Sequence, residues 1–281
     1  MRIQPIDLYA RSNAQMGIKM NQLVVKDLCK TYIVNKRPNN VLRNISLKIE
    51  EGEMAAVMGP SGSGKSTLLY TVSGMDNATA GKVSFFGKEI ESLSAREMSR
   101  IRLSQMGFIF QQMYLLKNLT IYDNIVLPAY QADGEKKVLS GRVRKKNREK
   151  INERARELMH KLGITEIADN DITEVSGGQL QRACICRSLI NQPKMIFADE
   201  PTGALNQQSS KEVMKELNRI NKEGTTIMLV THDSKVAAKC DRVLYIEDGT
   251  IKGEMKLGKF EEEKLRERER KLSGWLLEMG W

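Results

Sequence analysis

Several residue types are scarce in this chain, and their scarcity excludes some classes of site. The 281 residues include 4 cysteines and 2 histidines, and only 5% are aromatic. Cys29, Cys184, Cys186 and Cys240 do not have metal-ligand spacing, so we expect free thiols in a reducing cytosol. The sequence therefore offers no basis for a disulfide framework or a cysteine-based metal centre.

Long hydrophobic runs are also missing. No apolar stretch approaches the roughly 18 residues that a membrane-spanning helix requires. Residues 1–20 have no apolar segment of the kind found in secretory signals, and they show no periodicity. Met20 is followed directly by a strand-like segment. We therefore expect residues 1–20 to be an N-terminal extension, either disordered or not native, with Met20 as an alternative start of translation.

Positive charge is in excess, with 45 Lys and Arg against 35 Asp and Glu and a net charge of +10. Nucleic acid, an anionic membrane surface and polyphosphate would all match this balance. Much of the excess lies in residues 136–150, which we interpret as a solvated helix or loop. Aromatic residues are not interleaved with these lysines and arginines, which argues against a base-stacking nucleic-acid surface.

Hydrophobic patterning predicts strands at both ends of the chain and helices between them. Residues from about 92 to 190 read as helical and charged, except for a short strand at 107–110. Strands are predicted at 22–32, 46–50, 54–58, 195–199 and 226–232, with hairpins at 82–90 and 243–251. The alternation of buried strands with helices predicts an α/β fold with a mostly parallel core sheet.

A phosphate-binding loop is predicted at residues 59–67, GPSGSGKST, between a buried strand and a helix. Its backbone N–H groups and the following helix N-terminus would attract phosphate. Lys65 would neutralise the terminal phosphates, and Ser66 would hold Mg²⁺, which prefers oxygen ligands. The full set of expected nucleotide-contacting residues here is Gly59, Pro60, Ser61, Gly62, Ser63, Gly64, Lys65, Ser66 and Thr67.

Two carboxylates follow a second buried strand, in the segment MIFADE at 195–200. Asp199 at the strand tip is placed to reach Mg²⁺, and Glu200 is placed to polarise an attacking water. The apolar residues before them make a surface acidic pair or a helix cap a poorer interpretation.

A second glycine-rich helix start lies at residues 175–182, VSGGQLQR, and it has no lysine. Ser176 and Gln179 have the spacing of a capping box, which is sufficient as a local structural explanation.

These segments, in this order, resemble the ABC-type ATPases over about residues 22–255. The VSGGQ segment matches the signature motif of that family. Three further residues match the family only by order and context: Tyr32 as the ring beside adenine, Gln111 as the Q-loop glutamine and His232 as the switch histidine. Gln112 is a rival to Gln111, and the other histidine, His160, is interpreted as solvated.

The resemblance implies a P-loop NTPase fold of ABC type in which an antiparallel β subdomain and an inserted α-helical subdomain accompany the parallel sheet. The expected boundaries are an ATPase domain at 21–255, a helical subdomain at about 112–188 and a helical tail at 256–281. Leucines near one face of the tail favour packing on its own domain over docking to a partner.

The resemblance also implies the chemistry and the partners. The cofactors are ATP and Mg²⁺, with Ser66, Gln111 and Asp199 as metal ligands and Glu200, His232 and Gln111 as catalytic residues. A second copy of the chain would bind head to tail, so that its signature residues complete the nucleotide site across the interface. Those residues are Ser176, Gly177, Gly178 and Gln179, whose N–H groups are expected to be free at Ser176, Gly177 and Gly178. Asn206 replaces a common aspartate in the D-loop, which bears on communication between the two sites.

The layout resembles transporter subunits whose permease is a separate polypeptide, on the cytoplasmic face of the plasma membrane and without nucleic acid. The subgroup with lipoprotein-release, macrolide-export and antimicrobial-peptide-resistance ATPases is the most similar in its motifs. The alternative is a regulatory ATPase that acts on a membrane or cell-wall partner without transport. A small-molecule kinase or GTPase would share only the phosphate loop.

Overall fold

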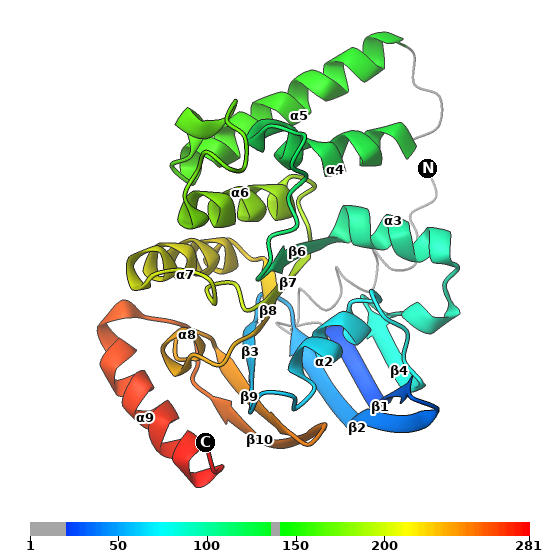
Figure 1. The fold of residues 1–281 in the computed structure, drawn as a ribbon, viewed down its shortest axis with the longest axis vertical. Coiled ribbons are helices and arrows are strands. Elements are labelled where there is room, and N and C mark those ends of the chain that lie inside the picture. Colours follow the sequence, from blue (N-terminus) through cyan, green and yellow to red (C-terminus); the bar gives the residue numbers. More distant parts are fainter. Residues whose placement is uncertain (1–20, 136–140) are drawn as a thin grey trace, which may run out of the picture.

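The computed structural model describes residues 21–135 and 141–281 and contains two sheets with helices packed around them (Figure 1). The extension predicted at residues 1–20 lies outside the described residues, as do residues 136–140 of the basic stretch. Within the described ranges, no helix is both long and apolar enough to cross a membrane.

The first sheet is antiparallel and the second is mostly parallel. The antiparallel sheet has the order β2-β1-β4-β5, and the larger sheet has the order β10-β9-β3-β8-β7-β6. Only the edge pair β10 and β9 of the larger sheet is antiparallel. The strands are β1 (Asn21–Val34), β2 (Arg37–Glu50), β3 (Met54–Met58), β4 (Ala80–Phe85), β5 (Lys88–Glu89), β6 (Met106–Phe110), β7 (Met195–Asp199), β8 (Thr226–Val230), β9 (Arg242–Glu247) and β10 (Thr250–Lys256). The predicted α/β class and both predicted hairpins are confirmed.

Helices connect the parallel strands, and three of them, α4, α5 and α6, form a separate layer above the sheets (Figure 1). The helices are α2 (Lys65–Val72), α3 (Ala95–Gln105), α4 (Ile121–Glu135), α5 (Gly141–Lys161), α6 (Gly177–Leu189), α7 (Gln207–Lys222), α8 (Ser234–Ala237) and α9 (Leu265–Glu278), with short 3₁₀ segments at Ile90–Ser92, Thr165–Ile167 and Glu262–Lys264. Helices α4, α5 and α6 pack against one another. They lie within the segment predicted as a helical subdomain, whose exact limits stay a prediction.

Strand β3 separates two hydrophobic cores, because its side chains alternate between the faces of the sheet. Met54, Ala56 and Met58 join the core formed with the large helices, including α6 and α7. Ala55 and Val57 join the second core, under α2 and the antiparallel sheet. All five residues are fully buried, as expected for a central parallel strand covered on both faces.

Strand β2 is longer than the sequence pattern predicts, beginning at Arg37 rather than at residue 46. Its first half is exposed and polar, so it carries no apolar alternation. Pairing with β1 extends it, from Val34 opposite Arg37 through Tyr32 opposite Asn39. Backbone pairing, rather than burial, therefore sets the limits of this hairpin.

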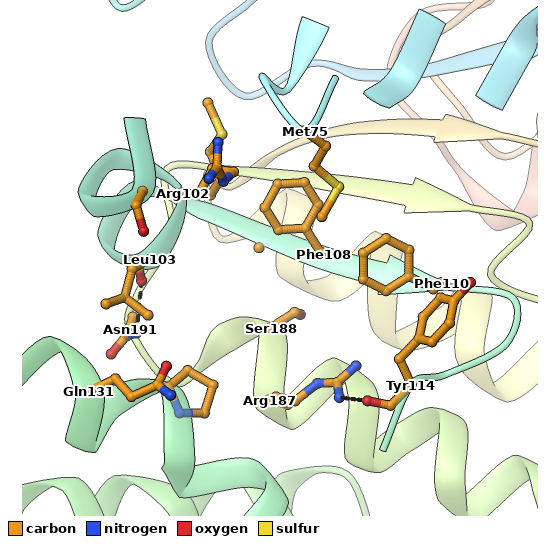
Figure 2. A pocket seen from close by; sticks show the side chains of 14 residues that line it. Met75, Arg102, Leu103, Phe108, Phe110, Tyr114, Gln131, Arg187, Ser188 and Asn191 are labelled. Atoms are coloured by element: carbon orange, nitrogen blue, oxygen red, sulfur yellow. Dashed lines mark hydrogen bonds between the residues drawn. The ribbon is translucent and has the colours of Figure 1, made fainter. Parts of the chain in front are cut away.

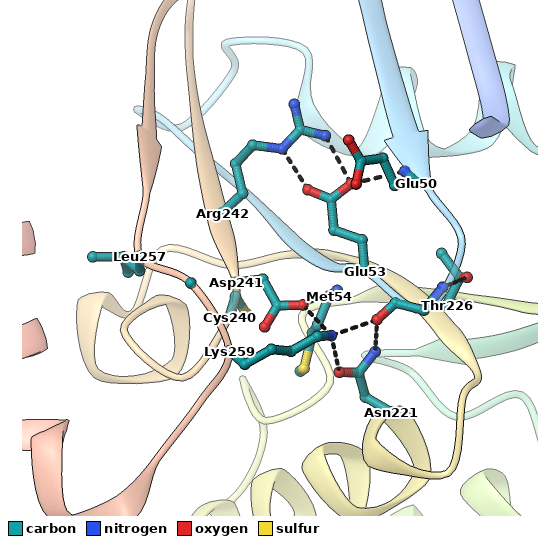
Figure 3. A network of polar contacts seen from close by, with 12 residues as sticks. Glu50, Glu53, Met54, Asn221, Thr226, Cys240, Asp241, Arg242, Leu257 and Lys259 are labelled. Atoms are coloured by element: carbon teal, nitrogen blue, oxygen red, sulfur yellow. Dashed lines mark hydrogen bonds and ion pairs between the residues drawn. The ribbon is translucent and has the colours of Figure 1, made fainter. Parts of the chain in front are cut away.

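The starts of the central strands are joined by polar contacts, at the edge opposite the phosphate loop (Figure 3). Arg242 at the start of β9 forms a two-pronged ion pair with Glu53, just before β3. Lys259 donates to Asp241, to Asn221 and to the Gly52 carbonyl. These contacts fix one edge of the sheet and leave the strand ends at the other edge available for chemistry.

Candidate nucleotide site

The phosphate loop joins the end of β3 to the start of α2, as the sequence predicts. Gly59 and Gly64 have φ values of 152° and 98°. A Cβ on Gly59 would lie 1.9 Å from the Ile246 carbonyl oxygen, and one on Gly64 would lie 2.9 Å from the Val41 carbonyl oxygen. Both positions therefore require glycine, and the loop can close tightly over the N-terminus of α2.

Lys65 lies across the loop that precedes it. Its Nζ donates to the carbonyl oxygens of Gly59 and Pro60, at 2.8 and 2.7 Å. Burial lowers the pKa of Lys65, although the carboxylates of Glu200 and Asp199 raise it. In the same loop, the Ser63 hydroxyl is buried without a hydrogen-bond partner among the described residues. The loop thus presents a cation and an unpaired hydroxyl where phosphate oxygens would bind.

Asp199 ends β7 and is held through both of its carboxylate oxygens. The Ser66 hydroxyl donates to Oδ1 at 2.9 Å, and the Tyr70 hydroxyl donates to Oδ2 at 2.6 Å. The side chain is buried, with 7% of its surface exposed. Two of the three residues predicted to hold Mg²⁺, Ser66 and Asp199, are therefore side by side.

Glu200 and His232, two of the predicted catalytic residues, contact each other. His232 Nδ1 lies 2.9 Å from Glu200 Oε1, while Glu200 Oε2 is buried without a partner among the described residues. Glu200 has a φ of 46°, an unusual value for a residue other than glycine. A Cβ on Gly203 would lie 3.1 Å from Gln111 Nε2 and 3.3 Å from Glu200 Cβ. The side chains of Gln111 and Glu200 therefore both lie next to Gly203. An unpaired carboxylate oxygen there can accept a proton from water.

Tyr32 and Asp76 form a small cluster beside this site. The Tyr32 hydroxyl donates to Asp76 Oδ2 at 2.5 Å, and Lys30 Nζ donates to Asp76 Oδ1 at 2.6 Å. The Lys30 ammonium lies over the Tyr32 ring, 4.6 Å from its centre. Burial and Asp76 raise the pKa of Tyr32, whereas a hydrogen bond with Thr67 lowers it. The ring is thus positioned next to the start of α2, and 37% of its surface is exposed.

The 176–179 turn begins α6, whereas the phosphate loop leads into α2. Within the described ranges, no hydrogen bond joins this turn to residues 59–67. Ser176 and Gln179 form the predicted capping box at the start of α6. The expectation of a free N–H at Ser176 is wrong, because this group donates to Gln179 Oε1 at 2.9 Å. Gly177 and Gly178 begin the helix, so their N–H groups have no acceptor in a preceding turn.

Glycine at 178 also has a packing role, since a Cβ there would lie 2.7 Å from the Ser209 hydroxyl on α7. Asn206, the unusual D-loop residue, accepts from Ser209 N–H and caps α7. Its local function is helix capping, which an aspartate would also perform.

Two site residues have no counterpart in the motif analysis, namely Tyr70 and Asp76. Tyr70 lies at i+4 from Ser66 on α2, so both side chains share the helix face that meets Asp199. That spacing was a usable signal in the sequence. Asp76 had no comparable signal, because its contacts with Lys30 and Tyr32 span two distant segments.

The oxygen groups at this site fit Mg²⁺. Mg²⁺ is commonly held by one or two carboxylates together with substrate phosphates. Ser66 and Asp199 supply a hydroxyl and a carboxylate beside the phosphate loop. The part of the chain that the structure describes contains no cluster of three or more His, Cys, Asp or Glu that could hold a metal unaided.

The model of the ABC transporter family matches residues 42–203 of the chain. The lipoprotein-releasing system ATP-binding protein LolD of Wigglesworthia glossinidia brevipalpis is 41% identical, covering 83% of this chain and 98% of that protein. The macrolide export ATP-binding/permease protein MacB of Psychrobacter arcticus is 39% identical over 87% of this chain. The match spans only 34% of MacB's length.

Among solved structures, the ATP-binding cassette MJ0796 as a dimer bound to ADP and Pi has a TM-score of 0.75 and 35% identity, covering 85% of this chain and 100% of that chain. CbiO1 of Clostridium perfringens, part of the transporter complex cbiONQ, has a TM-score of 0.72 and 27% identity. The motif order, the fold and these matches agree. The chain belongs to the ABC transporter family and is one of its ATP-hydrolysing cassettes.

Proposed function

We propose that the chain is the ATP-hydrolysing subunit of a bacterial transporter and drives a separately encoded permease through ATP-dependent, head-to-tail pairing of two copies. The observation that carries this proposal is the division of the chain into two half-sites. One half holds the phosphate loop, Asp199 and Glu200. The other is the open N-terminus of α6, which has glycines and a helix dipole but no lysine.

Two copies arranged head to tail would bring each α6 N-terminus to the phosphate loop of the other copy. The N–H groups of Gly177 and Gly178 would then donate to the terminal phosphate, whose charge Lys65 of the facing copy balances. Such closure excludes water from the nucleotide and assembles the complete site only when ATP is bound. The dimeric structure of the cassette MJ0796, bound to ADP and Pi, supports the pairing of two copies.

Within each site, Glu200 would accept the proton of the attacking water through its unpaired Oε2. His232 holds the other oxygen, which fixes the direction of the carboxylate. Gln111 lies against Gly203, next to Glu200, and would couple a change at the nucleotide site to a movement of the neighbouring helical layer. Lys65 binds and orients the phosphates that this water attacks.

Mg²⁺ would be held by Ser66 and Asp199, with Gln111 as the further ligand that the family pattern implies. When bound, the ion supplies positive charge that stabilises the phosphate oxygens during transfer. Asp199 is already oriented for this role by its two hydrogen bonds.

The permease would dock in a groove of about 360 Å³ between α3, β6, α4 and α6 (Figure 2). Phe108, Phe110 and Tyr114 face this groove, and Tyr114 is 61% exposed. Arg187 donates to the Met113 and Tyr114 carbonyl oxygens and holds the loop in place. Since Gln111 lies in the same loop, a helix seated there would contact the segment that leads to the nucleotide.

The relatives support a substrate class of envelope or exported compounds without identifying the substrate. LolD is named as part of a lipoprotein-releasing system and MacB as a macrolide exporter, so we propose export of, or resistance to, antimicrobial peptides or related envelope substrates. The subunit would lie on the cytoplasmic face of the plasma membrane and contact the membrane only through its permease.

The test compares ATP hydrolysis by the isolated chain with hydrolysis by the chain and its co-encoded permease in lipid vesicles. We expect stimulation by the permease, and loss of that stimulation in a Tyr114→Ala variant of the groove. A Leu277→Ala variant, changed at an exposed apolar residue on α9, is the control. Failure of every co-encoded membrane protein to bind the chain or alter its hydrolysis would contradict the proposal.

A further inference from the structure

We infer that Tyr70 is a positioning residue for the metal site: its hydroxyl fixes the Asp199 carboxylate so that one oxygen, Oδ1, faces Ser66 and the bound ion. This inference rests on the proposed Mg²⁺-dependent use of ATP. Tyr70 lies outside the motifs that carry the resemblance to the family, so it adds a residue to the site that those motifs define.

Two hydroxyl groups on helix α2 each donate a hydrogen bond to the Asp199 carboxylate. Ser66 and Tyr70 are separated by one turn of α2, and each donates to a different oxygen of Asp199. The Tyr70 contact, at 2.6 Å, is shorter than the Ser66 contact, at 2.9 Å. Ser66 and Asp199 Oδ1 would hold a bound ion, whereas the hydrogen bond from the Tyr70 hydroxyl to Asp199 Oδ2 would remain in place.

The position of the Tyr70 hydroxyl is itself fixed by packing. The Tyr70 ring centre lies 6.4 Å from that of Phe110. Phe110 is the residue paired with Asp199 across the parallel strands β6 and β7. On its other sides the Phe110 ring meets Phe108, at 6.0 Å, and Tyr114, at 5.2 Å. The phenol is thus held between the tip of β7 and a row of aromatic rings.

Removal of this hydroxyl would leave Oδ2 in a mostly buried position without its partner. The carboxylate could then rotate, so part of the time Oδ1 would no longer face Ser66. Loss of a residue that orients a metal ligand typically weakens metal affinity by about 10- to 100-fold. Tyr70 lies outside the phosphate loop at residues 59–67, and its hydroxyl donates to Asp199, so metal-free nucleotide binding should not change.

The test measures the affinity of a non-hydrolysable ATP analogue by calorimetry, once in excess Mg²⁺ and once in EDTA. For Tyr70→Phe we expect about tenfold weaker binding than wild type in Mg²⁺ and equal binding in EDTA. Tyr245→Phe is the matched control, because its hydroxyl is buried without a partner among the described residues. It should match wild type in both conditions.

Three other outcomes are informative. Equal affinities of wild type and Tyr70→Phe in Mg²⁺ would overturn the role of Tyr70. Equal weakening with and without Mg²⁺ would also overturn it, since this would indicate a purely structural effect on the phosphate loop. Absence of any Mg²⁺ effect on wild-type binding would instead overturn the metal-dependent chemistry of the proposed function, and with it the premise of this inference.

Discussion

Glu200 combines an unusual backbone conformation with an unpaired, buried carboxylate oxygen. Residues outside the common backbone regions cost roughly 1–3 kcal/mol each and concentrate at functional sites. His232 holds one oxygen and leaves the other free, which is the arrangement that a proton acceptor needs. Strain and isolation at this residue are therefore consistent with a role in hydrolysis.

Replacement of Glu200 by glutamine should separate ATP binding from ATP turnover. The amide keeps the shape of the side chain but cannot accept a proton, so we expect nearly normal binding and at least ~100-fold slower hydrolysis. Phosphate release and nucleotide binding would be measured on the same preparation. Glu261→Gln, at an exposed ion pair with Lys264, is the control. Hydrolysis close to wild type in Glu200→Gln would remove the residue from the catalytic role.

Asp76 should make stability depend on acid pH. Burial alone would raise its pKa, but hydrogen bonds from Lys30 and Tyr32 dominate and hold the pKa below its usual value. A carboxylate with a lowered pKa in the folded state stabilises above the unfolded-state pKa, and this contribution disappears as pH falls through the folded-state value. We therefore expect thermal melts from pH 7 to 3 to show a smaller acid-induced decrease in melting temperature for Asp76→Asn than for wild type. Identical pH profiles would contradict the assignment.

The four cysteines should differ sharply in reactivity. Cys29 is partly exposed, whereas Cys184, Cys186 and Cys240 are buried. Burial raises the pKa of the Cys184 thiol to about 11, and it raises those of Cys186 and Cys240 further. Because the thiolate is the reactive form, iodoacetamide at pH 7.5 should modify Cys29 first and the others only after denaturation. Mass spectrometry of the intact protein and its peptides would show the order, and early modification at Cys240 would contradict it.

At the scale of single elements, the start of α6 has two roles, local capping and the proposed contact with a second copy. A capping box would form in either case, so the local structure alone does not separate them. To distinguish the two roles, a substitution at this cap must be compared with the same substitution at an equivalent cap elsewhere in the chain. Helix α3 offers this match, because Ser94 and Glu97 form the same capping box.

Ser176→Arg should leave ATP binding by the isolated copy nearly intact and abolish ATP-driven dimerisation. The long cation would occupy the space into which the facing nucleotide must enter. Light scattering of the hydrolysis-deficient Glu200→Gln background with ATP would measure the dimer. Ser94→Arg loses an equivalent cap and should still dimerise. If Ser176→Arg lost ATP binding in the monomer, the division into two half-sites would be wrong.

Elements with a strong local signal were predictable from the sequence, and those set by distant pairing were not. The segment MAAVM matched β3 residue for residue, because a buried central strand is apolar throughout. The first half of β2 was missed because its exposed residues lack alternation. Tyr70 had a helical spacing that could have revealed it, whereas the contact of Asp76 with Tyr32 depends on the fold of two separate segments.

At the scale of the whole molecule, the terminal helix α9 is part of the larger core rather than a free tail. Leu272 and Leu276 are buried in that core, and Trp275 and Trp281 both pack edge-on against Tyr245. The spacing of the leucines predicted this packing, but nothing in the sequence indicated the polar contact that accompanies it. Arg268 is 6% exposed and bonds only to backbone carbonyl groups among the described residues.

Arg268 should therefore contribute strongly to stability. Its guanidinium donates to the carbonyl oxygens of Ala238 and Cys240, which follow α8, and to those of residues 257–259. Arg268→Met would keep much of the apolar stem but leave several carbonyl groups without a donor. We expect the free energy of unfolding to fall by about 2–4 kcal/mol. Denaturation by urea would measure this loss.

Arg270 lies on the same helix and is exposed, so Arg270→Met should change the free energy of unfolding by less than about 0.5 kcal/mol. Helix α8 begins two residues after His232, so the position of α8 also affects the switch histidine. Under conditions where Arg268→Met remains folded, its hydrolysis should be slower than that of Arg270→Met, because the segment after His232 is less firmly held. Equal stability of the two variants would show that apolar packing, rather than the Arg268 hydrogen bonds, attaches α9.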